Sequence, residues 1–340
     1  MSDLSGSVAP AAGGPAAPPT DMAGPQAGRL KKRRQVPELA ALVVVLLALC
    51  VFFSLRSEFF LNWDNWLNIL IAVSITGIIA APATMLIIAG QFDLSVGSAL
   101  TFCGIVMAYT AERQGILVAV LATIMAGLLV GALNGFLVTV IGVNALITTL
   151  GTLAAFAGLA RLLADGQTLI LDDFGTLGTT RIFFRIPIGV VIFLGVVLLF
   201  YLTMRYTVFG RSMYAIGANP VAARLSGIRS NRLIFFAFLL SGLCVTLGAL
   251  INVSQLGAAS TLAGNGVELS VVTAVILGGA SLAGGRGTIL GTMLGLLIIG
   301  VLNNGLVLMN IDAFWQDVAR GTLLILAVSF DQLRLRLGTR

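Results

Sequence analysis

The stretch Gly115-Ile-Leu-Val-Ala-Val-Leu-Ala-Thr-Ile-Met-Ala-Gly-Leu-Leu-Val-Gly-Ala-Leu-Asn-Gly-Phe-Leu-Val138 contains no charged side chain. About twenty consecutive apolar residues are enough for an α-helix to cross the hydrocarbon core of a bilayer. The stretch therefore predicts a membrane-spanning helix. Similar long apolar runs recur along the chain, and their number determines how many times the chain is predicted to cross the membrane.

Applied to the whole sequence, the same length criterion predicts an all-α polytopic membrane protein with about ten transmembrane helices. The predicted spans lie near residues 39–56, 66–89, 95–111, 115–138, 144–163, 186–204, 232–254, 268–285, 287–309 and 314–332. Because ten is an even number, both termini are expected on the same side of the membrane.

The composition agrees with this fold class. Of the 340 residues, 58% are hydrophobic and only 10% are charged, whereas a soluble domain carries about 25% charged residues. Lipid must therefore cover much of the surface. The net charge of +6 would suggest nucleic-acid binding in a soluble protein. Here the basic residues lie mostly between apolar runs, so we interpret them as topology signals and expect no nucleic-acid partner.

The distribution of positive charge gives the orientation. A basic cluster, Arg29 to Arg34, directly precedes the first apolar run and should hold that end in the cytoplasm. In the ten-span arrangement, about fourteen of the basic residues fall on cytoplasmic segments. We therefore divide the chain into a disordered cytoplasmic tail with the basic cluster (1–35), a transmembrane domain (36–333) that includes a cytoplasmic loop (205–231), and a cytoplasmic tail (334–340).

Two residue types are missing or nearly missing. The chain has no His, and its only lysines are Lys31 and Lys32. A phosphate-binding P-loop needs a Lys after its glycines, so this chain cannot be its own P-loop ATPase. Without imidazole groups, we predict no catalytic residue and no metal site. The three cysteines, Cys50, Cys103 and Cys244, lie in apolar runs and are not expected to form a disulfide framework.

The two halves of the chain resemble each other. Asp93-Leu-Ser-Val-Gly-Ser98 opens the third predicted span, and Glu268-Leu-Ser-Val-Val-Thr273 opens the eighth. The glycine-rich segment 127–135 of the fourth span likewise matches 295–305 of the ninth. An offset of five spans reverses orientation, so these matches predict an inverted five-helix repeat, which is typical of transporters. Chance likeness among Gly- and Leu-rich helices is the alternative.

Both glycine-rich helices carry small residues one helical turn apart, at Gly127, Gly131 and Gly135 and at Gly287, Gly291 and Gly295. This spacing lets helix backbones approach closely in lipid. It favours either a tightly packed pore wall or ordinary helix packing.

Polar groups inside a membrane are costly, so each needs a partner or water. Asp93, Ser95 and Glu268 precede apolar runs and are predicted to cap helix N-termini, with gating as the alternative. Uncharged amides and hydroxyls both donate and accept hydrogen bonds, which suits a path for a neutral hydroxylated solute. The candidates for such a path, or alternatively for interhelical hydrogen bonds, are Asn134, Asn144, Thr148, Thr149, Asn252, Asn303 and Asn304.

The cytoplasmic loop 205–231 contains a short helix signal. Asn219 is a strong N-cap, Pro220 fits the first helical position, and Gly227 suits the left-handed position that ends a helix. The intervening residues make about two turns, which are marginal in water on their own. The helix must therefore dock on the membrane surface, on the rest of this chain or on a partner protein.

These motifs together resemble the permease subunits of ribose/xylose/galactoside-type ABC importers. The likeness is carried by segments 210–228, 277–287, 91–97 and 302–306, and it extends from about residue 60 to the C-terminus. The long Ala/Pro-rich N-terminal tail departs from the family pattern.

The resemblance implies a multi-pass protein of the bacterial inner membrane. Two permease copies, as a homodimer or a heterodimer, would assemble with two cytoplasmic ATPase chains and a periplasmic sugar-binding protein. ATP would be used by the ATPase, and this chain would bind no cofactor. The short helix would be the coupling helix that docks on the ATPase, through Asn219, Pro220, Val221, Ala222, Arg224, Leu225, Ser226 and Gly227.

Three other functions were weighed. An ion-coupled secondary transporter would also show inverted repeats, but it should place acidic residues in the middle of helices, whereas here they mostly flank the spans. An intramembrane enzyme needs a base or a metal set, which the lack of His disfavours. The resemblance argues against a scaffold without transport activity.

Overall fold

The computed structural model describes residues 38–171, 174–182 and 185–338, and the N-terminal tail predicted over 1–35 lies outside these residues. The helices are α1 (Glu38–Arg56), α2 (Trp63–Ile88), α3 (Val96–Gln114), α4 (Ile116–Phe136), continued by the π-helical turn η1 (Leu137–Ile141), α5 (Ala145–Leu163), α6 (Thr176–Thr179), α7 (Ile188–Tyr206), α8 (Val208–Ala218), α9 (Pro220–Leu225), α10 (Ser230–Leu256), α11 (Val267–Leu277), α12 (Ile289–Leu308) and α13 (Ala313–Gly338). Four two-residue strands form two antiparallel pairs, β1 (Leu169–Ile170) with β4 (Ala258–Ala259) and β2 (Arg181–Ile182) with β3 (Ile186–Pro187).

Among the described residues, seven helices are long and apolar enough to cross a membrane: α1, α2, α4 with η1, α5, α7, α10 and α12. The chain is therefore an all-α polytopic membrane protein, as the sequence predicts. The other predicted spans correspond to α3, α11 and α13, which do not meet the same criterion of length and composition.

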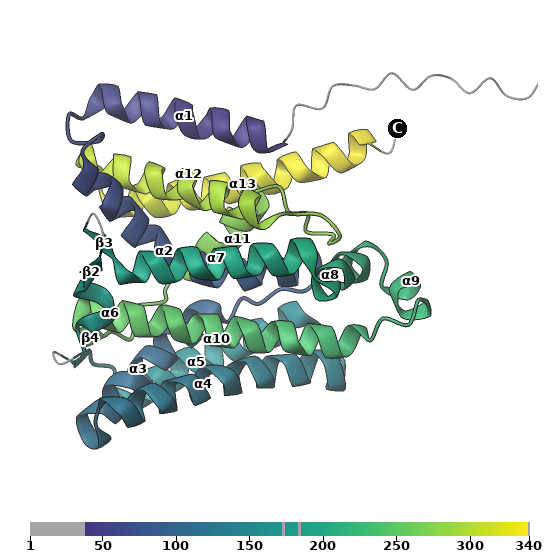
Figure 1. Cartoon of the computed structure of the whole chain (residues 1–340), viewed down its shortest axis with the longest axis horizontal. Helices are drawn as coiled ribbons and strands as arrows, with labels where there is room; N and C mark the ends of the chain where they lie inside the picture. The colour runs from purple at the N-terminus through teal and green to yellow at the C-terminus, as the bar shows by residue number, and fades with distance from the viewer. Residues whose placement is uncertain (1–37, 172–173, 183–184, 339–340) are drawn as a thin grey trace, which may run out of the picture. The chain divides into compact units, whose positions relative to one another are not determined.

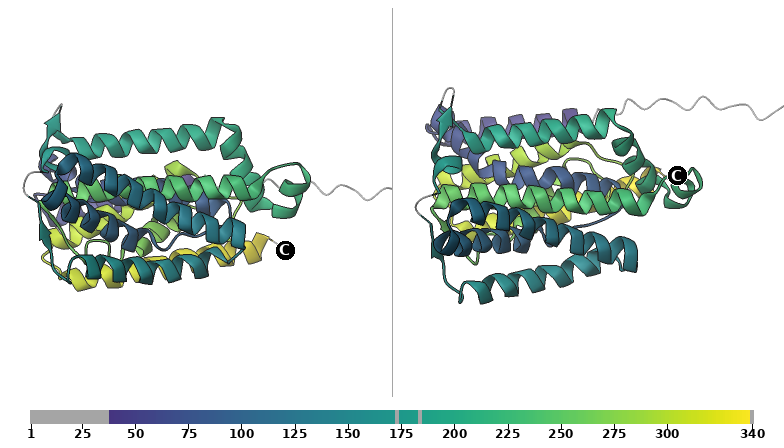
Figure 2. Two further views of the ribbon diagram at one scale, coloured as in Figure 1. Left: turned by 90° about the horizontal axis from the view of Figure 1, so that it is seen from below. Right: turned by 60° about the horizontal axis from the view of Figure 1, so that its bottom comes forward.

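The long helices run along one common direction (Figure 1; Figure 2). Within this bundle, α10 packs against α2, α3 and α4, and α2 also packs against α7 and α12. The main core cluster is centred on these helices and includes Ile78, Ile79 and Phe238, none of which is exposed. Many side chains of α4, α5 and α7 are exposed instead. In a chain of this class, lipid or another protein covers such apolar surface.

Glycines allow α4 and α10 to pack closely. A Cβ atom at Gly242 of α10 would meet the carbonyl oxygen of Gly127, and one at Gly131 of α4 would meet that of Phe238. The spacing in α4 thus serves packing against α10. The corresponding stripe in the second half is shorter than predicted, because Gly287 lies before α12, with φ +141°, and only Gly291 and Gly295 pack against α11.

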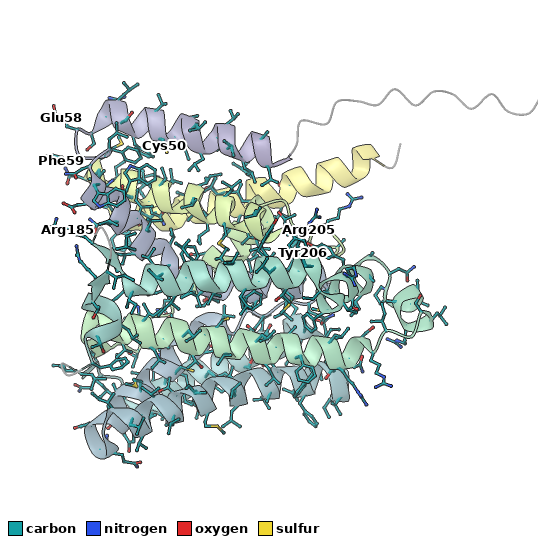
Figure 3. All side chains as sticks on the ribbon, in the orientation of Figure 1. Cys50, Glu58, Phe59, Arg185, Arg205 and Tyr206 are labelled. Atoms are coloured by element: carbon teal, nitrogen blue, oxygen red, sulfur yellow. The ribbon has the colours of Figure 1, made fainter. Side chains whose placement is uncertain are left out.

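The bundle has two distinct ends. The beginning of α1, the end of α13, and helices α8 and α9 lie at one end, which we call the α9 end, and the strands and α6 lie at the other (Figure 1). Polar residues mark both ends, since Figure 3 shows Glu58 and Arg185 near the strands and Arg205 on the side of α8. At the strand end, Arg185 lies 3.9 Å from the Asp64 carboxylate.

The predicted span over 268–285 is wrong in its second half. Helix α11 ends at Leu277, after 11 residues, and is too short to cross a bilayer alone. The chain then passes through Gly279, Gly284 and Gly285, whose φ values of +89°, +83° and +75° are readily adopted only by glycine. These glycines let the segment 278–288 leave the helical path. Helix α13 continues to Gly338, so most of the segment predicted as the cytoplasmic tail, 334–340, is helical.

Candidate translocation and coupling sites

A buried carboxylate lies where the chain is not helical. Between α2 and α3, residues 89–95 form a turn and an extended segment, and Asp93 is only 8% exposed. Its Oδ1 atom accepts hydrogen bonds from the Ser95 hydroxyl (2.6 Å) and the Ser95 N–H (3.1 Å). Its Oδ2 atom accepts one from the Ser241 hydroxyl of α10 (2.8 Å). Asp93 has no ion pair within the described part of the chain, so these donors stabilise the carboxylate.

The network extends to two more helices. The Asn134 amide of α4 donates to the Ser95 hydroxyl (2.8 Å), and its carbonyl oxygen accepts from the Thr152 hydroxyl of α5 (2.8 Å). One hydrogen-bond network around Asp93 thus joins four segments that are distant in sequence: the 89–95 segment, α4, α5 and α10. A change at any member leaves a buried polar partner unsatisfied, which typically costs about 1–3 kcal/mol.

The capping predictions need correction. Ser95 occupies the N-cap position of α3 without a side-chain capping bond, and its hydroxyl serves Asp93 instead. The Asp93 side chain does accept a backbone N–H, that of Ser95. Asp93 nevertheless lies two residues before Ser95, the N-cap residue of α3, and so does not occupy the cap position. Glu268 is not the cap of α11, because Gly266 is, and Glu268 lies in the first turn. The negative charge of Glu268 therefore lies near the N-terminus of α11, as predicted, although the Glu268 side chain does not cap the helix.

The beginnings of α3 and α11 meet inside the bundle. The Gly264 N–H donates to the Thr101 hydroxyl (2.9 Å). A Cβ atom at Gly97 would meet both the Glu268 carboxylate and the Gly264 carbonyl oxygen. Interrupted helices whose N-termini meet within the membrane region are a feature of many transporters, in which they surround the transport path.

Most of the predicted path residues make structural hydrogen bonds. Asn144 caps α5 by accepting the Leu146 N–H (2.9 Å) and the Ile147 N–H (3.4 Å). Thr149 donates to the Ala145 carbonyl oxygen within α5 (2.9 Å). Asn304 of α12 forms a reciprocal amide pair with Asn65 of α2, at 2.8 and 3.0 Å. Asn252 is half-buried on α10.

Two predicted path residues have unused hydrogen-bonding capacity. The Thr148 hydroxyl of α5 and the Asn303 carbonyl oxygen of α12 are buried without a hydrogen-bond partner among the described residues. Asn303 also lines a cavity of about 400 Å³ together with Asn68, Ser270 and Gln316. Thr148 and Asn303 lie on different helices, and α5 and α12 are not among the helix pairs that pack closely in the described structure.

Two members of the Asp93 network were missed by sequence reasoning. Thr152 follows Thr148 at helical spacing on the buried face of α5, and that periodicity was the available signal. Ser241 lies beside Gly242 in the middle of α10, where most neighbouring residues are apolar. Its sequence context does not point to Asp93, which is 148 residues away.

The short helix of the cytoplasmic loop has the predicted local structure. Asn219 caps α9 through bonds from the N–H groups of Val221 (3.1 Å) and Ala222 (3.0 Å), and Pro220 is the first helical residue. Gly227 has φ +82°, as expected for the left-handed position. Leu225 is 85% exposed, so the helix presents apolar surface that the described part of the chain leaves uncovered.

Helix α8 links α9 to the bundle. The Tyr214 hydroxyl donates to the Gly287 carbonyl oxygen (2.8 Å), and the Gly285 N–H donates to the Ile88 carbonyl oxygen (2.8 Å). Burial raises the pKa of the Tyr214 phenol, an effect that the Arg205 guanidinium partly offsets, so the hydroxyl remains a donor at neutral pH. A Cβ atom at Gly217 would meet the Ile88 carbonyl oxygen. Helix α8, the end of α2 and the 278–288 segment therefore form one junction.

Membrane-length helices, interrupted helices that meet inside the bundle, and an exposed short helix at one end define a multi-pass membrane protein of the transporter class. Residues 65–328 match the family described as "Branched-chain amino acid transport system / permease component". The chain belongs to this permease family.

Several relatives cover most of the chain. It is 37% identical over 300 residues to the ribose import permease protein RbsC of Escherichia coli K12, covering 85% of this chain and 92% of that protein. It is 35% identical to the D-allose transport system permease protein AlsC of the same organism (85% and 90%) and 36% identical to RbsC of Bacillus subtilis (84% and 90%). No solved structure matches the chain.

Proposed function

We propose that this chain is the membrane-spanning permease subunit of a bacterial inner-membrane ABC importer for a sugar. The observation that carries the proposal is its similarity, over most of its length, to permeases named for ribose and allose import. The sequence lacks a P-loop Lys, so ATP hydrolysis must take place on a separate ATPase chain.

In this proposal α9 is the coupling helix. Its contact residues for the ATPase are Asn219, Pro220, Val221, Ala222, Arg224, Leu225, Ser226 and Gly227. The exposure of Leu225 and Val221, at 85% and 68%, supports docking on a partner, since both are large apolar side chains at the end of the bundle. Movement of α9 would reach the spans through the Tyr214 and Gly285 contacts with the 278–288 segment and α2.

The ten-span arrangement with an inverted repeat belongs to the same proposal. Helix α4 packs against α3 and α10, whereas α12 packs against α11 and α2. An offset of five spans pairs α2 with α10, α3 with α11 and α4 with α12. With this pairing, the contacts that α4 makes in the first half are equivalent to those that α12 makes in the second. The α9 end, where α1 begins and α13 ends (Figure 1), would face the cytoplasm.

For the sugar path we retain the seven predicted residues and favour Thr148 and Asn303. Their buried oxygens lack partners among the described residues, so a sugar hydroxyl could satisfy them. Asp93, Ser95 and Glu268 would act in gating, because they lie where the non-helical segments meet α3, α10 and α11. A second permease copy and a periplasmic sugar-binding protein would complete the transporter.

The decisive experiment is purification of the tagged chain from its native host in mild detergent. We expect a cytoplasmic ATPase in one-to-one ratio, and ATP-dependent sugar uptake when the complex and its binding protein are placed in vesicles. A preparation without ATPase that moves sugar down an ion gradient would overturn the proposal in favour of a secondary transporter. Collapse of the ion gradient by a protonophore separates the two cases.

The orientation makes its own prediction. In a variant with the three native cysteines replaced, Gln167→Cys at the strand end should react with a membrane-impermeant maleimide in intact cells. Ser226→Cys at the α9 end should react only after the cells are permeabilised. Both residues are exposed, so accessibility to reagent is the only difference between them. The reverse labelling pattern would contradict cytoplasmic termini.

A further inference from the structure

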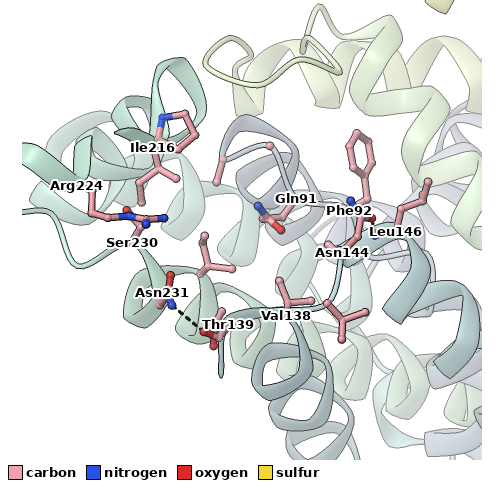
Figure 4. Close-up of a pocket in the computed structure, with 16 residues that line it drawn as sticks. Gln91, Phe92, Val138, Thr139, Asn144, Leu146, Ile216, Arg224, Ser230 and Asn231 are labelled. Atoms are coloured by element: carbon pink, nitrogen blue, oxygen red, sulfur yellow. Dashed lines mark hydrogen bonds between the residues drawn. The ribbon is translucent and has the colours of Figure 1, made fainter. Parts of the chain in front are cut away.

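A second cavity lies at the α9 end of the bundle. It has a volume of about 450 Å³ and is lined by the 89–92 turn, part of η1 and the turn that follows it, the first residues of α5, part of α8 and α9, and the beginning of α10 (Figure 4). This volume is within the range of small-molecule sites. The proposed sugar path and ATPase contact include some of its lining, but they do not account for Ser230 and the beginning of α10.

The charge of the lining has one sign. Arg224 is its only charged side chain, and no Asp or Glu contributes to it. Arg224 is exposed and forms no ion pair with any residue that the structure describes. Its guanidinium can therefore reorient toward a ligand. Arg is the side chain best suited to phosphate, because its N–H groups match two oxygens at once.

The beginning of α10 adds a second positive contribution. Helix α10 spans 27 residues from Ser230, and a long helix carries a partial positive charge at its N-terminus, where anions bind. Asn231 also lines the cavity, but its amide already donates to the Thr139 carbonyl oxygen (2.7 Å; Figure 4). The N-terminus of α10 is thus held against the end of η1 and faces the cavity.

A buried hydroxyl at the same place lacks a partner. Ser230 is only 7% exposed and lines the cavity, and its Oγ atom forms no hydrogen bond with the described chain. Ser212 of α8, which is also buried, differs, because its hydroxyl donates to the Val208 carbonyl oxygen (2.8 Å). Leaving a buried hydroxyl unpaired is costly, so the geometry of Ser230 indicates a hydrogen-bond partner that the described part of the chain does not supply.

From these three observations we infer that the cavity between α9, α10 and the η1–α5 turn binds a phosphate group, with Ser230 and Arg224 as its ligands and the α10 N-terminus as a source of positive potential. The volume exceeds that of inorganic phosphate and accommodates a phosphate monoester of a small sugar. A lipid headgroup offers the same chemistry. Of its ligands, Ser230 belongs to neither the proposed sugar path nor the proposed ATPase contacts, whereas Arg224 is also one of the proposed ATPase contacts. A bound phosphate would connect Arg224 of α9 to α10 and so oppose movement of α9.

Binding to the full chain in nanodiscs tests the inference. In phosphatidylcholine discs at constant ionic strength, titration calorimetry with inorganic phosphate and with a pentose 5-phosphate should give saturable binding. Ser230→Ala should weaken it about tenfold or more, because a hydrogen bond to a charged group is lost. Arg224→Gln should do the same, and its exposed position keeps the fold intact. Ser212→Ala is the matched control and should bind as the unmodified chain does.

The source of the phosphate is separated by a second arm. The soluble phosphates could give no heat while phosphatidic acid in the discs raises the melting temperature of the unmodified chain but not that of Ser230→Ala or Arg224→Gln. That result would mean that the site takes a lipid headgroup. Either pattern supports the phosphate site. Absence of both effects, or equal responses from the unmodified chain and both variants, would overturn it.

Discussion

Replacing Leu225 with Asp is expected to abolish ATP-driven sugar uptake while leaving the membrane domain folded. In the isolated chain, the Leu225 side chain is 85% exposed at the end of α9, so the fold loses no core contact. In the proposed complex, the same side chain is buried on the ATPase. Burying a Leu side chain contributes about 1.5–3 kcal/mol, and a carboxylate in its place carries an additional desolvation cost. We expect ATPase docking to weaken at least tenfold.

The measurement compares uptake and ATP hydrolysis in vesicles, with size-exclusion profiles in detergent as the test of folding. Leu225→Met is the matched control, since it nearly conserves volume and hydrophobicity and should retain most uptake. Uptake at the unmodified rate in the Leu225→Asp variant would show that α9 is not the coupling helix.

Replacing Gly242 with Val should sharply reduce the amount of folded protein. A Cβ atom at this position of α10 would meet the Gly127 carbonyl oxygen of α4 and lie 3.1 Å from the Gly131 nitrogen. Both obstacles are backbone atoms, which cannot move aside as a flexible side chain would. Overpacking a core typically costs about 1–3 kcal/mol, and the rigid contact places Gly242→Val at or above the upper end of that range.

Gly195→Val on α7 is the control for this substitution. Gly195 is also within a membrane-length helix, but a Cβ atom there meets nothing within 4 Å. The two variants therefore share their change in helix propensity and differ in the contact with α4. Melting curves in detergent should show Gly195→Val close to the unmodified chain and Gly242→Val many degrees lower. Equal stability of the two variants would mean that α4 and α10 are not packed as closely as described.

Much of the fold could be predicted from local sequence. Each of the ten predicted spans corresponds to a helix, because apolar length is a property of a continuous segment. The N-cap, first-turn Pro and terminal Gly of α9 were also predictable, since capping depends on residues within a few positions of each other. The error over 268–285 arose because apolar composition continues through Gly278 and Ala280 although the helix does not.

The candidate sites were predictable only in part. The sequence identified Asp93, Ser95 and Asn134, but not that they share one network with Thr152 and Ser241. It grouped seven candidates for a sugar path or for interhelical hydrogen bonds, without indicating which of them make structural bonds or with which partners. The hydrogen-bond partners of these side chains can be far apart in the chain, so no local periodicity of the sequence could identify them.

By itself, the sequence determined that this chain spans a membrane, that it carries no P-loop of its own, and that a short capped helix lies between α8 and α10. These properties follow from composition and from neighbours along the chain. Only the tertiary structure decided which buried polar groups have partners. Thr148, Asn303 and Ser230 lack them among the described residues, whereas Asp93 does not. The physical reason is that satisfaction of a buried polar group depends on which helices pack together.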